Sequence, residues 1–204
     1  MPDEQLDRGP WNIVGDRVAV GPVLRSHLPL YLRWTNDFHT QRTQGNGLPM
    51  PDPPDNIEGW YDSFVRGRAD VAFFTIYERE SGRPIGWTGL EDIDFHHRRA
   101  TFVVQIGEPE CRGKGYGTEV AQLMLDYGFT ALGLHNINLW YYEFNIAGPK
   151  AYERAGFREY GRRRQSHYMG GRLWDTVFME CLSIEFASGP LAEIFAPDVE
   201  RGPS

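Results

Sequence analysis

Three glycines alternate with other residues in the segment Arg112-Gly113-Lys114-Gly115-Tyr116-Gly117-Thr118. The preceding residues, 100 to 107, have the pattern of a strand. The following residues, 115 to 132, carry apolar side chains at i, i+4, i+7, i+8 and i+11, one face of an amphipathic helix. A glycine-rich turn between a strand and a helix lets the backbone approach a ligand, and the first helical amides point toward it. Because Arg112 and Lys114 add positive charge, the segment predicts an anion-binding loop.

Two common phosphate-binding motifs do not fit this loop. A nucleotide-binding P-loop requires serine or threonine after its lysine, whereas Gly115 follows Lys114. A dinucleotide fingerprint counted from Gly113 requires a third glycine where Thr118 stands. A plain glycine-rich turn before a helix remains as the alternative without a ligand.

Hydrophobic periodicity predicts the other elements of the chain. A polar stretch rich in glycine and proline, residues 36 to 55, is too long for an ordinary connection and predicts a functional loop. We expect a mixed α/β fold with one domain over residues 15–182, an N-terminal extension over 1–14 and a C-terminal tail over 183–204. The predicted strands are 17–20, 71–78, 85–95, 100–107, 137–142, 158–168 and 173–182, and the predicted helices are 27–34, 57–65, 115–132 and 145–156.

Composition narrows the function classes. The 204 residues include 21 Lys and Arg against 28 Asp and Glu, and the net charge of −7 argues against a nucleic-acid binder and mildly favours a cationic partner. The only cysteines, Cys111 and Cys181, form no C-x-x-C pair, which indicates a reducing cytoplasm and neither a zinc site nor a disulfide framework. The histidines have no metal-ligand spacing. No secretory signal and no membrane-length apolar run is present, so we expect a cytoplasmic protein without a metal.

The glycine loop has the form R/Q-x-x-G-x-G, which marks the acetyl-CoA pyrophosphate loop of the GNAT superfamily of N-acetyltransferases. The chain resembles this superfamily over about residues 15–182. Asn145 through Lys150, Tyr152 and Ala155-Gly156-Phe157 are similar to its second cofactor-binding segment, commonly N-x-x-A-x-x-x-Y-x-x-x-G-F. The resemblance implies a GNAT-type domain, with a central, mostly antiparallel twisted sheet flanked by helices.

Shorter segments resemble particular branches of the superfamily. Gly15-Asp16-Arg17-Val18 with Trp34-Thr35-Asn36-Asp37 is similar to the opening of the RimJ/RimL branch of ribosomal-protein N-terminal acetyltransferases. His97-Arg98-Arg99-Ala100 and Asp126-Tyr127-Gly128-Phe129-Thr130 resemble spermidine N-acetyltransferases. The resemblance also implies a possible homodimer.

For the site, the resemblance implies acetyl-CoA as cosubstrate. A backbone amide on the strand before the loop is expected to polarise the thioester carbonyl, and Asn145 is expected both to cap its helix and to contact the cofactor. The implied cofactor-binding residues are Val104, Gln105, Ile106, Arg112, Gly113, Lys114, Gly115, Tyr116, Gly117, Thr118 and Asn145.

Two further residues are predicted to transfer protons. Tyr152 matches the family position that protonates the leaving thiolate, although its spacing also suits a core aromatic residue. An alkyl ammonium has a pKa of ~10, so the amine must lose a proton before it attacks. Strand alternation predicts that Asp92 and Asp94 lie on the face opposite Glu91 and Ile93. We predict Asp92 as the base, with a solvated strand face as the alternative reading of these acids.

The sequence therefore predicts an acetyl-CoA-dependent N-acetyltransferase in which a primary amine attacks the thioester directly. The acceptor classes left open are a small amine, an amino sugar and a peptide N-terminus. The alternative is a non-catalytic acyl-CoA-binding or interaction domain on the same fold. A nucleotide-dependent kinase is disfavoured by the two motifs that do not fit.

Overall fold

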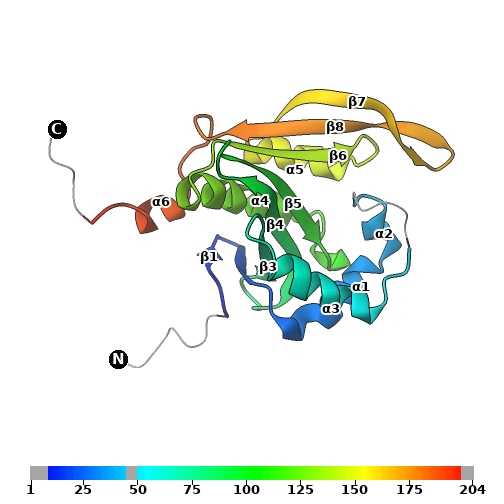
Figure 1. The fold of residues 1–204 in the computed structure, drawn as a ribbon, viewed down its shortest axis with the longest axis horizontal. Helices are drawn as coiled ribbons and strands as arrows, with labels where there is room; N and C mark the ends of the chain where they lie inside the picture. Colours follow the sequence, from blue (N-terminus) through cyan, green and yellow to red (C-terminus); the bar gives the residue numbers. More distant parts are fainter. Residues whose placement is uncertain (1–8, 45–49, 199–204) are drawn as a thin grey trace.

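The computed structural model describes residues 9–44 and 50–198, which form one eight-stranded sheet flanked by helices (Figure 1). The strand order is β1-β2-β3-β4-β5-β6-β8-β7. This arrangement confirms the mixed α/β fold. The strands are β1 (Ile13–Val14), β2 (Val18–Pro22), β3 (Ala72–Glu78), β4 (Pro84–Asp94), β5 (Arg99–Ile106), β6 (Asn136–Tyr142), β7 (Arg158–Met169) and β8 (Arg172–Leu182).

One strand pair positions the site. Six of the seven strand pairs among the described residues are antiparallel, and β5 with β6 is parallel. Parallel pairing joins β5 to β6 only at Arg99, Ala100 and Thr101, after which β5 continues to Ile106 without this partner. The carboxyl end of β5 therefore has an unpaired edge on the side toward β6.

Helices cover both faces of the sheet. The helices are α1 (Leu28–Thr35), α2 (Phe38–Gln41), α3 (Pro54–Trp60), α4 (Tyr116–Asp126), α5 (Ala147–Ala155) and α6 (Leu191–Ile194). π-helical turns extend α3 over Tyr61–Val65 and α4 over Tyr127–Ala131, which accounts for the lengths of the two predicted helices.

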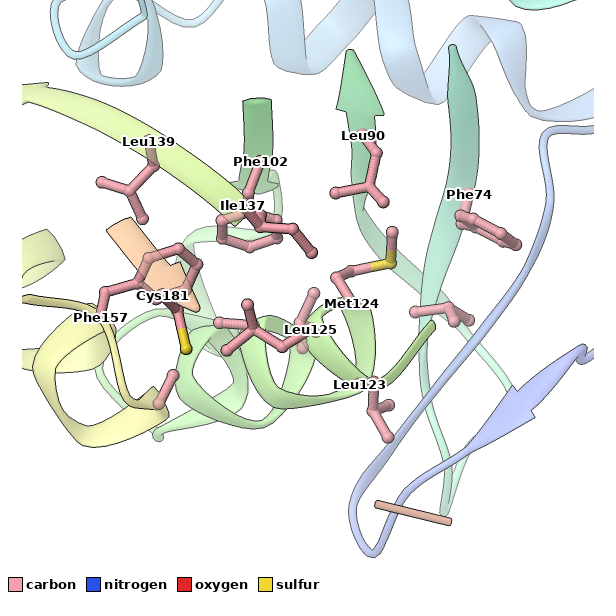
Figure 2. Packing of buried hydrophobic residues seen from close by; sticks show 14 of the residues in the cluster. Phe74, Leu90, Phe102, Leu123, Met124, Leu125, Ile137, Leu139, Phe157 and Cys181 are labelled. Atoms are coloured by element: carbon pink, nitrogen blue, oxygen red, sulfur yellow. The ribbon is translucent and has the colours of Figure 1, made fainter. Parts of the chain in front are cut away.

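Two apolar clusters fill the space between the helices and the sheet. On one face, α4 contributes Leu123, Met124 and Leu125, which pack against strand residues such as Leu90 and Ile137 (Figure 2). We call this first cluster the main core. On the other face, α1 and α3 pack an aromatic cluster against β3 and β4. We call this second group the aromatic cluster, and its buried members are Val23, Leu28, Tyr31, Trp34, Ile57 and Phe73.

The predicted loop over residues 36 to 55 is partly wrong, because Phe38–Gln41 forms α2. Asp37 caps this helix, since its Oδ1 accepts a hydrogen bond from the His39 N–H at 3.0 Å. A four-residue helix has too short a periodic pattern to be recognised in sequence. Residues 45–49 lie outside the described part of the chain.

A β-bulge corrects the predicted alternation of the acids on β4. The pairing of β4 with β5 shifts register between Glu91 and Asp94, and Asp92 has a φ of 50°. This extra residue turns Ile93 toward the main core, where Leu90 also lies, so Ile93 does not share a face with Glu91. The prediction failed because strict alternation holds only in a regular strand.

The packed structure extends past both predicted domain boundaries. Ile13, before residue 15, is 4% exposed and belongs to β1 at the edge of the sheet. Leu191, after residue 182, is also 4% exposed, and its N–H donates to Asp126 Oδ2 at 2.7 Å. Within residues 9–44 and 50–198, no helix is long and apolar enough to cross a membrane.

Candidate active site

Two glycines of the glycine loop have positive φ angles, a backbone conformation that favours glycine. Gly113 and Gly115 have φ angles of 73° and 84°, in the left-handed region that a side chain strains, and Gly115 directly precedes α4. A Cβ at Gly113 or Gly117 would meet no atom within 4 Å. The loop therefore exposes open backbone at the N-terminus of an eleven-residue helix, where amides favour an anion.

Arg17 binds the carbonyl oxygens of this loop. Its Nη1 donates to the Lys114 carbonyl at 2.9 Å, and its Nη2 donates to the Gly115 carbonyl at 3.4 Å. Its Nε also pairs with Glu119 of α4 at 3.1 Å. Because the guanidinium binds carbonyl oxygens, the loop amides remain available for a ligand. Sequence analysis did not identify this role of Arg17, because 97 residues separate it from Lys114.

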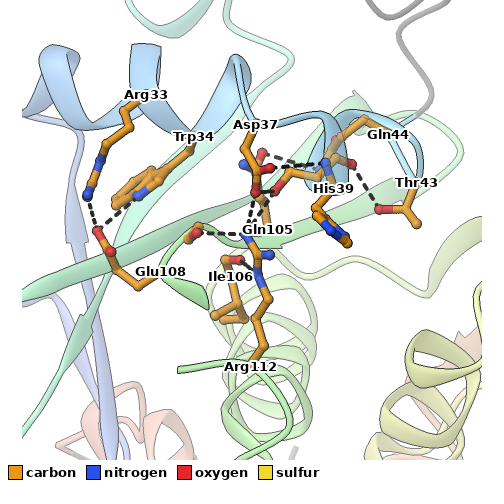
Figure 3. Close-up of polar contacts among 12 residues, drawn as sticks. Arg33, Trp34, Asp37, His39, Thr43, Gln44, Gln105, Ile106, Glu108 and Arg112 are labelled. Atoms are coloured by element: carbon orange, nitrogen blue, oxygen red, sulfur yellow. Dashed lines mark hydrogen bonds and ion pairs between the residues drawn. The ribbon is translucent and has the colours of Figure 1, made fainter. Parts of the chain in front are cut away.

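Arg112 connects the loop to α2 (Figure 3). Its guanidinium donates to the carbonyls of Ile106 at 3.0 Å and Gly107 at 2.8 Å, and to Asp37 and Thr40 at 3.0 and 2.9 Å. Asp37 neutralises this charge, so the side chain of Arg112 positions α2. Its predicted contact with the cofactor stays a prediction.

The Asp37 carboxylate is held in its ionised form. Burial alone would raise its pKa, but hydrogen bonds from Arg112, the His39 N–H and Thr40 together lower that pKa below its usual value. The contact between α2 and the loop therefore includes a charged pair at neutral pH.

A cavity of about 390 Å³ lies beside the loop. Most of the residues predicted to bind the cofactor line it, as do residues of α2 and α5 that the sequence did not single out. Lys114, Asn145 and Asp92 are not among its lining residues. The lining consists of His39, Thr40, Thr43, Gln44, Val104, Gln105, Ile106, Cys111, Arg112, Gly113, Gly115, Tyr116, Gly117, Thr118, Ala147, Gly148, Lys150, Ala151, Tyr152 and Arg154.

The charge of the lining fits a polyanion. Lys150 and Arg154 of α5 contribute two positive charges to the lining, and no aspartate or glutamate is among the described lining residues. These two cations could have been suspected from the second cofactor-binding segment, in which they stand two residues on either side of Tyr152. Together with the open glycine amides, they suit a pyrophosphate-containing cofactor.

Tyr152 projects from α5 into the same cavity. Its ring packs edge-on against Phe102 and Phe157, with centroids 6.4 and 6.3 Å away, which fixes its position. Burial, with a smaller contribution from Tyr141, raises the pKa of Tyr152 to about 12. The phenol is therefore protonated at neutral pH and can donate a proton inside the cavity.

The remaining predicted residues lie at the margin of the cavity or outside it. Asn145 lies one residue before Ile146, the N-cap of α5, so its predicted N-cap position is displaced by one residue, but its Oδ1 still accepts a hydrogen bond from the Gly148 N–H in the first turn at 3.1 Å. Asp92 has a side chain that is 75% exposed, and its carboxylate lies 3.4 Å from Arg68. Cys111 lines the cavity, but burial and the Glu78 charge raise the pKa of its thiol, so it is protonated and not a nucleophile.

Comparison with known proteins agrees with this geometry. The family model for the acetyltransferase (GNAT) domain matches residues 17–158. Spermidine N(1)-acetyltransferase from Vibrio cholerae is 33% identical over 135 residues, covering 65% of this chain and 75% of that protein. Alpha/beta-tubulin-N-acetyltransferase 9 from Homo sapiens is 29% identical over 139 residues, covering 60% and 63%.

A solved structure shares the fold over nearly its whole length. The crystal structure of Vibrio cholerae spermidine N-acetyltransferase in complex with CoA and spermine superposes with a TM-score of 0.76 at 26% identity, covering 84% of this chain and 99% of that one. The RimJ/RimL branch stays a prediction. The chain belongs to the acetyltransferase (GNAT) domain family, and it is an acetyl-CoA-dependent N-acetyltransferase that transfers the acetyl group to an amine.

Proposed function

We propose that the cavity binds acetyl-CoA with its pyrophosphate on the backbone amides of residues 113–118. The open space at Gly113 and Gly117 supports close approach, and Lys150 and Arg154 supply the opposing positive charge. The thioester end then lies along the edge of β5 formed by Val104, Gln105 and Ile106, where β6 no longer pairs with β5.

We propose Tyr152 as the general acid. The proposed catalytic mechanism depends on this one assignment. The amine nitrogen forms a bond to the carbonyl carbon, the carbon–sulfur bond breaks, and the leaving thiolate takes the Tyr152 proton. The amine nitrogen gives up one proton to a base or to water, and the Tyr152 phenolate regains a proton from water, so that the products are an amide and free CoA. A phenol that stays protonated well above neutral pH, in the cavity beside the loop, supports this role.

The base stays a prediction. Asp92 lies outside the cavity lining and is paired with Arg68, so its role as base requires a chain of water molecules between the amine and its carboxylate. A primary amine is proposed as the acceptor class. The spermidine enzyme and the tubulin enzyme differ in the acceptor that their names give, so family membership alone leaves the acceptor open.

The proposed function is tested by incubating the full chain with acetyl-CoA and a panel of primary amines, amino sugars and short peptides. Free thiol is measured with a chromogenic reagent, and acetylated products are identified by mass spectrometry. We expect thiol release that depends on at least one amine and matches the amount of N-acetyl product. Acetyl-CoA binding without amine-dependent thiol release would contradict the proposal.

A further inference from the structure

Gln105 is a buried polar residue that the roles proposed above do not explain. It lies on β5 and is 5% exposed, and its side-chain Oε1 accepts a hydrogen bond from Gln44 Nε2 at 3.2 Å (Figure 3). Its Nε2 has no hydrogen-bond partner among the described residues. Leaving a buried donor unpaired is costly, so such a group calls for a partner that is supplied from outside the protein.

Alternation along β5 places this side chain on the face of the sheet opposite the one that α4 covers. Val104 and Ile106 face the main core beneath α4, whereas Val103 packs against the aromatic cluster on the opposite face. Gln105 alternates with Val104 and Ile106, and therefore lies on the face of Val103, next to α2. The proposed pyrophosphate amides and Tyr152 belong to α4 and α5, so the side of the cavity formed by α2 and Gln105 is left for the acceptor.

Gln44 determines which end of the Gln105 amide is available. Because Gln44 donates to the carbonyl oxygen, the nitrogen is the end of the Gln105 amide that is left without a partner among the described residues, and this end has only N–H donors. An ammonium group can only donate hydrogen bonds, so it cannot pair with this end of the amide. An oxygen atom of a hydroxyl, ether or carbonyl group can accept from it.

The charges around the cavity support the same conclusion. A polyamine brings a second ammonium group, which requires a carboxylate or other acceptors once it leaves water. No residue with an acidic side chain is among the described residues that line the cavity, and Asp37, beside it, is already paired with Arg112.

We propose that Gln105 is the specificity-determining residue for the acceptor, and that the acceptor is a small primary amine bearing a hydrogen-bond-accepting oxygen. This inference rests on the proposed function of the cavity. It sets the preferred acceptor of this chain apart from the polyamine named for its Vibrio cholerae relatives.

The experiment compares matched amines in which only the oxygen differs. The pairs are 2-aminoethanol with propylamine, 3-aminopropan-1-ol with butylamine, and 4-aminobutan-1-ol with pentylamine, and spermidine is the polyamine. For the wild type, we expect kcat/KM for the best-fitting amino alcohol to exceed that for its alkylamine partner by about 10-fold or more. Spermidine is expected to be a poorer acceptor than that amino alcohol.

Two variants assign the preference to Gln105. Gln105→Leu removes the donors at similar volume and is expected to reduce the amino alcohol to alkylamine ratio to within about 2-fold of unity. Gln105→Glu keeps the shape and replaces the donor by a carboxylate, so spermidine is expected to become a better acceptor than in the wild type. Gln122→Leu, on the exposed face of α4, is the matched control and should leave the ratio unchanged.

Acetyl-CoA affinity, measured by calorimetry, and thermal unfolding show whether each variant is folded. If Gln105→Leu fails to fold, the Gln105→Glu variant still tests the inference, because it is isosteric. An unchanged ratio in a folded Gln105 variant, or spermidine as the best wild-type acceptor, would overturn the inference while leaving the acetyltransferase function intact. Absence of turnover with every amine would instead overturn the proposed function itself.

Discussion

At the scale of single residues, Tyr152 shows how a surrounding structure changes an ordinary side chain. The spacing of the second cofactor-binding segment marked this tyrosine, but only the packing of Phe102, Phe157 and Tyr141 around it explains its raised pKa. Its hydroxyl stays protonated over the whole neutral range. A neutral phenol is what a leaving thiolate requires.

The variant Tyr152→Phe is expected to lower kcat by roughly 10- to 1,000-fold, because it removes the acid and keeps the ring. Acetyl-CoA affinity should change little. Tyr141→Phe is the matched control, since Tyr141 packs against Tyr152 but does not line the cavity. Steady-state kinetics with a known acceptor check the comparison, and wild-type turnover in Tyr152→Phe would mean that solvent protonates the thiolate.

Glu91 supplies a prediction that concerns stability. Burial, with the neighbouring Asp92 charge, raises the pKa of its carboxyl. A carboxyl whose pKa is higher in the folded chain binds its proton more tightly there, so the free energy of unfolding falls as pH rises above the unfolded value of ~4.3. Glu91→Gln removes this charge and is expected to raise the melting temperature at pH 7 and not at pH 4.

The comparison variant for Glu91 is Asp92→Asn, which alters an exposed carboxylate and also removes a charge that contributes to the raised Glu91 pKa, so it is expected to change the melting temperature at pH 7 less than Glu91→Gln does. Thermal unfolding at pH 4, 5.5 and 7 provides the measurement. An equal gain for Glu91→Gln at all three pH values would show that ionisation of Glu91 is not the cause.

At the scale of elements, the glycine loop and α2 both line the cavity, and side-chain contacts join them. Arg17 holds the loop carbonyls, and Arg112 joins the base of the loop to Asp37 at the start of α2. Glu108 is buried after β5 and accepts hydrogen bonds from Trp34 Nε1 at 3.0 Å and from Arg33 of α1 (Figure 3). These contacts fix the positions of α1 and α2 relative to the glycine loop.

The variant Gly117→Val tests the glycine loop. Gly117 lacks a positive φ, and its Cβ would enter open space, so the fold should tolerate the side chain while the pyrophosphate loses close approach. We expect acetyl-CoA affinity to fall by about 10-fold or more in calorimetry, because the added methyl groups block hydrogen bonds to a charged ligand. Gly115 is a poorer test, since its φ of 84° would strain any side chain.

Gly59→Val is the matched control for this substitution. Gly59 lies in α3, also has open space around its Cβ, and does not line the cavity. Both variants should retain wild-type melting temperatures within a few degrees. Equal acetyl-CoA affinity in the two variants would remove the loop from the binding site.

At the scale of the whole molecule, the chain on both sides of the predicted domain takes part in one core. Asp126 is completely buried at the end of α4 and accepts hydrogen bonds from Thr130 and from the Leu191 N–H. This buried carboxylate binds the segment around α6 to α4. The C-terminal segment therefore contributes to the stability of the helix that follows the cofactor loop.

The variant Leu191→Ala is expected to lower the free energy of unfolding by about 2–5 kcal/mol, as for other buried leucines. Ile194→Ala, three residues later and 69% exposed, should change it by about 0.5 kcal/mol or less. Urea denaturation followed by circular dichroism provides both values. A loss at Leu191 no larger than that at Ile194 would show that α6 does not pack on the core in solution.

The sequence by itself determined the features that depend on neighbouring residues. Strand and helix periodicity located most elements, the spacing of the glycines located the glycine loop, and the resemblance of the segment around Tyr152 to a family motif suggested the proposed acid. These features are local because side-chain period and backbone chirality act over a few residues.

The tertiary structure decided what depends on distant segments coming together. It placed Arg17 against the loop from about 97 residues away, brought α2 to Arg112, and paired Gln44 with Gln105. The bulge that displaces Asp92 also depends on the pairing of β4 with β5, because register is a property of two strands.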